Sequence, residues 1–198
     1  WLAERCANQG LTDLALKIFM AMNKYRLTVK PAFSWPGDED NERRHRLDAK
    51  CEFHADHWSV SQIWTEHLKP KMAQVAQPML AGIVQRFEDM HSELRAWDKA
   101  SREWDPVSYR RSAIEPHEQD RFPEVVDVLI DAARDSLEWL AANSPSLLGA
   151  WIEMLVASDA PLVRRLAIHA TTVNSKLSPD LRLEWLLIRI GICESMEH

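Results

Sequence analysis

Glycine is scarce in this chain of 198 residues, which contains only five. Folds built from many strands and tight hairpin turns use glycine freely, so the composition argues against a strand-rich fold. The sequence also lacks an apolar run long enough to span a membrane, and it does not open with a signal peptide. We therefore expect a cytoplasmic protein with no membrane partner.

Paired cysteines and an excess of basic residues are also missing. The three cysteines have no paired spacing and predict reduced thiols in a cytoplasmic compartment. The formal net charge of -6 weighs against a nucleic-acid partner, because neutralising phosphates takes clustered lysine and arginine. Tryptophan, in contrast, is abundant at nine residues, and large aromatic side chains favour buried helix contacts or interfaces.

The clearest pattern is a long apolar seam at spacings of three and four, which predicts a long helix. Its members are Ala76, Leu80, Ile83, Phe87, Met90, Leu94 and Trp97. A second long helix is expected to begin near Pro123, since proline fits the first helical turn. Its shared face consists of Val126, Leu129, Ala133, Leu137 and Leu140. Together these two segments predict a long helical hairpin.

The last third carries an internal repeat. Ser144-Pro145 and Ser178-Pro179 lie 34 positions apart, and Trp151 and Trp185 have the same offset (151 to 185). Two helices per period of this length are typical of solenoid units. We predict an all-α fold in which HEAT- or TPR-like, α-solenoid-like helix pairs over 144–198 follow the hairpin.

The region 26–56 looks different from the rest and is expected to be a long polar loop, because it holds Pro31, Pro36, Gly37 and an acidic run. The alternation over 47–53 allows one short strand there. The chain opens on Trp1, in what looks like the last turns of a helix. We therefore expect 1–198 to be a single helical domain and a fragment of a larger protein.

Two polar groups could carry chemistry. Cys51, His54 and His57 recur at three-residue steps, and Asp56 or His45 could complete a zinc site. Structural zinc sites usually show two paired clusters, so a polar loop leading into a helix is the favoured interpretation. We expect neither a metal nor another cofactor.

The second group lies between residues 110 and 121, where His117 beside Glu118 could act as acid and base. Its arginines could bind a carboxylate or phosphate. The candidate binding residues are Arg110, Arg111, Glu115, His117, Glu118 and Asp120. No glycine-rich phosphate loop accompanies them. We favour a structural connector whose arginines and carboxylates satisfy one another.

Three segments resemble a known family. They are WDKASREWDPVSYRRSAIEPHEQD at 97–120, PLVRRLAIH at 161–169 and LEWL at 183–186. They resemble the helical C-terminal region of large bacterial proteins that carry an N-terminal sirtuin-like domain and are associated with anti-phage defence. The resemblance implies that a domain elsewhere cleaves NAD and that the helical region senses or regulates. It assigns no catalytic residue to this chain.

The preferred hypothesis is a non-catalytic interaction or regulatory (sensor) module of such a multidomain protein. Its partners would be other domains of the same polypeptide or another protein. The first alternative is an enzyme with an acid/base site around His117, Glu118, Arg110 and Arg111. The second alternative is a zinc-stabilised binding domain.

Overall fold

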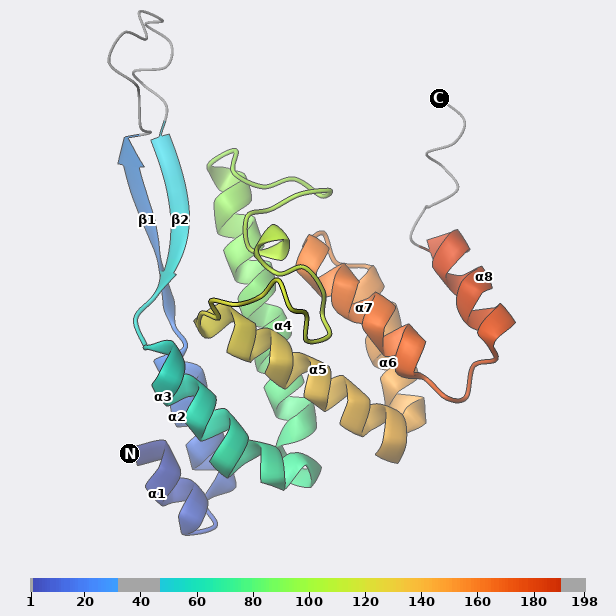
Figure 1. Cartoon of the computed structure of the whole chain (residues 1–198), viewed down its shortest axis with the longest axis horizontal. Coiled ribbons are helices and arrows are strands. Elements are labelled where there is room, and N and C mark those ends of the chain that lie inside the picture. The colour runs from blue at the N-terminus through green and yellow to red at the C-terminus, as the bar shows by residue number, and fades with distance from the viewer. Residues whose placement is uncertain (1, 32–46, 190–198) are drawn as a thin grey trace, which may run out of the picture.

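The computed structural model describes residues 2–31 and 47–189. This part is mostly helical and includes one two-stranded antiparallel sheet (Figure 1). The all-α prediction is therefore right for most of the chain and wrong for the hairpin. The order of elements begins with α1 (Leu2–Asn8) and α2 (Thr12–Met22), which are separated by Gly10 at a φ of 78°. Glycine adopts this left-handed conformation without steric cost.

Strands β1 (Tyr25–Pro31) and β2 (Leu47–Phe53) pair in the register Leu27 to Cys51. They replace the polar loop expected over 26–56 in its described parts, and residues 32–46 lie outside the described residues. The short strand that the alternation over 47–53 allows is present as β2. Alternate residues of the two strands are apolar and point to the same side, so the hairpin has one apolar face. In β2 this face is turned toward α4.

A helical path then runs from residue 57 to residue 96. It starts with α3 (His57–Gln62), where Asp56 accepts a hydrogen bond from Ser59 N–H at 2.9 Å. A π-helical turn over Ile63–Leu68 and a 3₁₀ turn over Lys69–Lys71 lead into α4 (Met72–Ala96). The chain reverses direction at these irregular turns, so α3 and α4 run in opposite directions (Figure 1).

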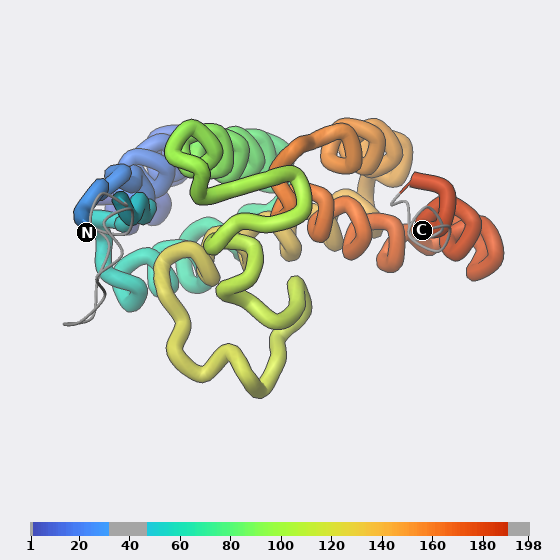
Figure 2. The backbone as a smooth tube through the Cα atoms, turned by 90° about the horizontal axis from the view of Figure 1, so that it is seen from above, coloured from blue at the N-terminus to red at the C-terminus, as the bar shows by residue number. Residues whose placement is uncertain are grey.

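Helix α4 packs against α5 (Val125–Asn143), as the apolar seams predict. Every predicted seam residue is buried except Trp97, which is 41% exposed beyond the end of α4. The two helices are not joined by a tight turn, however. Residues 97–124, here called the connector, pass over α4 and α5 and loop away from the helices (Figure 2). The connector contains only a short 3₁₀ turn over Ser108–Arg110.

The last three helices are α6 (Pro145–Val156), α7 (Pro161–Val173) and α8 (Pro179–Arg189). Helices α6 and α7 pack on each other and on α5. Helix α8 touches α7 but buries none of its described residues. Helices α6 and α8 begin at the two prolines of the repeat, Pro145 and Pro179. The repeat architecture over 144–198 is nevertheless not confirmed and stays a prediction.

One continuous core of buried side chains extends from α1 to α7. The side chain of Met20 from α2 packs over Gly82 of α4, where a Cβ would lie 2.8 Å from Cε of the methionine. Within the described ranges, no helix is both long enough and apolar enough to cross a membrane.

Candidate functional site

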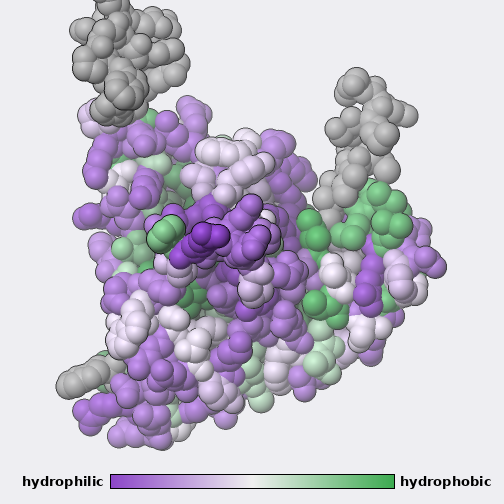
Figure 3. All heavy atoms as spheres, viewed as in Figure 1, coloured by the Kyte–Doolittle hydropathy of each residue, from purple (hydrophilic) through white to green (hydrophobic). Residues whose placement is uncertain are grey.

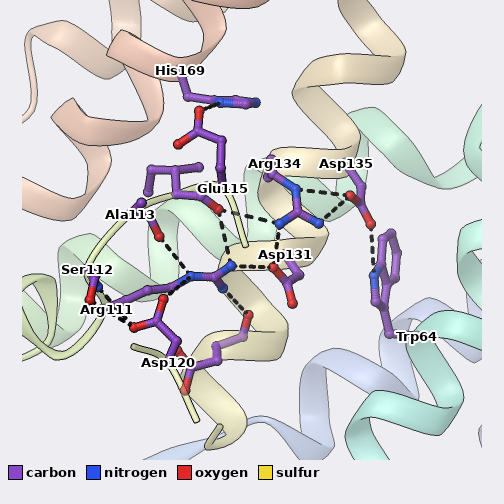
Figure 4. A network of polar contacts seen from close by, with 12 residues as sticks. Trp64, Arg111, Ser112, Ala113, Glu115, Asp120, Asp131, Arg134, Asp135 and His169 are labelled. Carbon is purple, nitrogen blue, oxygen red and sulfur yellow. Dashed lines mark hydrogen bonds and ion pairs between the residues drawn. The ribbon is translucent and has the colours of Figure 1, made fainter. Parts of the chain in front are cut away.

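The buried guanidinium of Arg111 is the centre of the connector. Its Nη2 donates to Oδ1 of Asp131 at 2.8 Å, and its Nε donates to the Ala113 carbonyl at 2.8 Å. Further hydrogen bonds reach the carbonyls of Ile114 and Asp127. With 5% of its surface exposed, Arg111 is committed to the fold and is not available to a ligand (Figure 4).

The same charge network continues along α5. Arg134 bonds Asp131 at 2.7 Å and Asp135 at 2.9 Å. Asp135 in turn accepts a hydrogen bond from Nε1 of Trp64 and pairs with Lys69, so α5 is tied to the irregular turns between α3 and α4. Figure 4 shows the contacts that lead from Asp131 through Arg134 and Asp135 to Trp64. This arrangement agrees with the structural connector that the sequence favours.

Among the other candidates of the polar stretch, Asp120 pairs with Arg111 at 3.8 Å between its Oδ2 and Nε of the arginine, whereas His117 and Glu118 have no such contact over the ranges that the structure describes. Asp120 accepts from the N–H of Ser112 at 3.1 Å, and Nδ1 of His117 accepts from the N–H of Gln119 at 3.2 Å. Glu118 is exposed. Among the described contacts, no hydrogen bond or ion pair joins His117 or Glu118 to Arg110 or Arg111. The acid/base arrangement that the enzyme alternative needs is therefore not assembled here.

Arginines from α7 hold the connector by its carbonyl groups, which the sequence did not reveal. Arg165 donates to the carbonyls of Arg111 and Ser112 at 3.0 Å each and also to that of Ser108. Arg164 donates to the carbonyl of Arg102. Burial lowers the pKa of both guanidinium groups. Because backbone acceptors carry no sequence signature, only the adjacent arginines themselves hint at this role.

A cleft of about 910 Å³ opens between β2, the end of α4, the connector and the start of α5. It is the candidate binding site. The residues that line it from these elements include Ala49, Cys51, Phe53, Met90, Leu94, Lys99, Trp104, Pro106, Val107, Tyr109, Arg110, Glu124 and Val126. Of the predicted site residues, Arg110, Cys51 and His57 line this cleft.

Asp105 shapes the connector wall of the cleft. Its Oδ1 accepts from the N–H groups of Val107 at 2.8 Å and Ser108 at 2.7 Å. This turn presents Trp104 and Tyr109 on the surface, with ring centroids 6.1 Å apart. These two residues are 45% and 68% exposed. Large exposed aromatic side chains beside an apolar cleft are typical of binding surfaces.

The zinc candidates are not gathered into a metal site. Cys51 lies in β2, His54 follows this strand, and His57 begins α3. Within the described residues, no group of three or more His, Cys, Asp or Glu side chains could hold a metal ion. Burial, together with the negative charges of Glu93 and Asp105, raises the pKa of the Cys51 thiol to about 12. The thiol is therefore protonated and a poor nucleophile at neutral pH.

The cleft is electrically balanced. Lys50, Lys99 and Arg110 line it together with Asp48, Glu52 and Glu124. Arg110 pairs with Glu124 at 2.7 Å.

In comparisons with known proteins, no protein-family model, no curated protein and no solved structure matches this chain.

Proposed function

We propose that this chain is a non-catalytic interaction and regulatory module of a larger bacterial protein in the cytoplasm, and that it binds its partner through the cleft along β2. The cleft itself is the observation that carries this proposal. Its walls are mainly apolar, and its rim bears the exposed rings of Trp104 and Tyr109. Apolar pockets with a few polar groups are the preferred binding places on protein surfaces.

The groups in the cleft favour binding over catalysis. Acid–base or nucleophilic catalysis needs side chains whose pKa values suit proton transfer or attack near neutral pH. The only thiol in the cleft, Cys51, is held protonated. The acid/base candidates His117 and Glu118 do not line the cleft at all. The lining instead suits shape and hydrophobic recognition.

The charge balance favours a protein partner. Three cationic and three anionic side chains line the cleft, so no concentrated positive field exists there to bind phosphates. An interface with apolar walls, aromatic anchors and a polar rim is typical of protein–protein recognition. The partner is accordingly another domain of the same polypeptide or a separate protein.

The resemblance of 97–120, 161–169 and 183–186 gives the proposal its biological setting. We propose that a sirtuin-like domain elsewhere in the polypeptide cleaves NAD and that this module senses a trigger or restrains that domain, in anti-phage defence. The repeat-like helices over 144–198 belong to the same proposal, because stacked helix pairs offer extended binding surfaces. The exposed apolar side chains on α8 fit this reading (Figure 3).

The test uses the intact protein that contains this chain. NAD consumption is compared between the unaltered protein, a double variant Trp104→Ala/Tyr109→Ala and the control Trp58→Ala. Trp58 is 69% exposed and lies outside the cleft. A regulatory cleft predicts a rate change of at least about fivefold in the double variant alone. Equal rates in all three proteins, or a reading frame without a sirtuin-like domain, would refute the regulatory proposal.

A photo-activated cross-linker placed at residue 104 tests the binding claim separately from the NAD chemistry. The proposal expects cross-links to one defined segment of another domain or protein, and it expects none from a cross-linker at residue 58. Scattered or identical products from both positions would show that the cleft is not the binding surface.

A further inference from the structure

The backbone of β2 is open along the side that faces the cleft. Among residues 2–31 and 47–189, β2 pairs with β1 alone, and the cleft is lined by six consecutive residues of β2, from Asp48 to Phe53. Successive side chains of a strand point to opposite faces, so a cleft that touches all six runs along the edge of the strand. In Figure 1, β2 accordingly lies between β1 and the rest of the molecule.

The register identifies which backbone groups are open. The N–H of His54 donates to the carbonyl of Lys24 directly opposite, which makes this a hydrogen-bonded pair. In an antiparallel ladder such pairs alternate with pairs whose N–H and C=O groups point outward. The residues that point outward on β2 are therefore Ala49, Cys51 and Phe53. Their N–H and C=O groups have no hydrogen-bond partner in the described part of the chain.

We propose that the cleft binds an extended peptide segment of a partner protein, which adds to the open edge of β2 as a third antiparallel or parallel strand. This inference rests on the proposed binding role of the cleft and names the chemistry of its ligand. Added strands gain affinity from backbone hydrogen bonds and gain specificity from pockets for alternate side chains. The open groups of Ala49, Cys51 and Phe53 supply the hydrogen bonds.

The residues that line the cleft also indicate which side chains the bound peptide should carry. On one side of the added strand lie the apolar groups of Met90, Leu94 and Val126. Lys50 and Glu52 lie on the opposite face of β2, since they alternate with the apolar positions. The ligand is therefore a peptide with apolar residues at alternate positions and little net charge, because the charges of the cleft balance one another.

The experiment selects binders from a phage-displayed library of random linear peptides on the full chain. A synthetic copy of the tightest binder is then measured against Cys51→Pro and Cys51→Val. Proline removes the outward N–H of residue 51 and leaves the ladder with β1 intact, whereas valine keeps that N–H. We expect Cys51→Pro to weaken binding about tenfold and Cys51→Val to leave it within about twofold.

N-methylated copies of the peptide test the same bonds without altering the protein, so the experiment does not depend on the folding of Cys51→Pro. Methylation of one alternate set of amides should abolish binding, and methylation of the other set should not. Equal binding of both methylated peptides, failure to select any peptide, or a dimer of this chain that occupies the edge would overturn the added strand. If Trp104→Ala weakens binding while neither methylation pattern does, the binding role of the cleft survives and only the β2 edge is refuted.

Discussion

Nδ1 of His169 lies 2.6 Å from Oε1 of Glu115, which joins α7 to the connector across 54 residues of sequence. Nε2 of the same ring lies 3.2 Å from Oε1 of Glu138 on α5, although without hydrogen-bond geometry. His169 is buried, whereas the side chain of Glu115 is 58% exposed. The connector is thus fastened from two sides, by this pair and by Arg111.

The Glu115 contact predicts a dependence of stability on pH. Partial burial raises the pKa of Glu115, but the hydrogen bonds from His169 and from the backbone lower it further, so the net shift is downward. A carboxylate with a lowered pKa stabilises the fold above its unfolded pKa of about 4.3 and loses this contribution as the pH falls through the folded pKa. Glu115→Gln should therefore lower the free energy of unfolding at neutral pH, by less than about 1 kcal/mol because the side chain is exposed.

Urea denaturation of Glu115→Gln over a pH series checks this sign. The difference in unfolding free energy between Glu115→Gln and the unaltered chain should vanish as the pH falls below about 4. There the protonated Glu115 is as uncharged as the glutamine that replaces it. Glu118→Gln is the matched control and should show no gap at any pH. A gap for Glu115→Gln that widens at acid pH would contradict the account.

Arg111→Met should destabilise the fold strongly. The substitution removes a buried guanidinium, takes the donor from the carbonyls of Ala113 and Asp127, and leaves Asp131 paired with Arg134 alone. Loss of one partner from a buried charge network costs about 3 kcal/mol. Arg121→Met, whose Nε reaches only the exposed Glu118 carbonyl, should cost less than about 0.5 kcal/mol. Similar chemical denaturation midpoints for both variants would show that Arg111 is not the centre of the connector.

The core between α4 and α5 gives a second stability prediction. Leu129 is fully buried, so Leu129→Ala should lower the free energy of unfolding by about 2–5 kcal/mol. Met154 on α6 is 49% exposed, and Met154→Ala should change it by less than about 1 kcal/mol. Thermal or urea unfolding distinguishes the two. A small loss for Leu129→Ala would mean that the α4–α5 contact is not the core.

The raised pKa of Cys51 predicts slow alkylation. At a pKa of about 12 the thiolate is rare near neutral pH, and the thiolate is the reacting form. Iodoacetamide should therefore label Cys51 at least about a hundredfold more slowly in the folded chain than in urea. Peptide mass spectrometry resolves this cysteine from Cys6 and Cys193. Labelling at equal rates in both conditions would show that the thiol is neither buried nor shielded by negative charge.

The helices were readable from the sequence because their apolar residues recur over many turns. The seam from Ala76 to Leu94 and the face from Val126 to Leu140 are buried as predicted. Strand β2 was also visible, since alternation over seven residues is a local signal. Strand β1 was missed because Pro31 and the following acidic run suggested a loop. Its place depends on pairing with β2, which no short segment reveals.

The site was less readable, because its contacts join residues far apart in sequence. The sequence favoured a connector in which charges pair, yet it did not show that the partner of Arg111 is Asp131 on α5, 20 residues away. The cleft combines β2 with the connector and α5, and nothing in the spacing of these segments predicts their meeting.

The most direct test of the account is residue-resolved amide hydrogen exchange along β2, measured by NMR on the free chain and with the selected peptide. In the free chain, Lys50 and Glu52 should be protected by the ladder, while Ala49, Cys51 and Phe53 should exchange fast. The bound peptide should slow exchange at those three amides. Uniform protection along β2 in the free chain, or unchanged exchange at the three amides on binding, would contradict the claim that this open edge is the binding site.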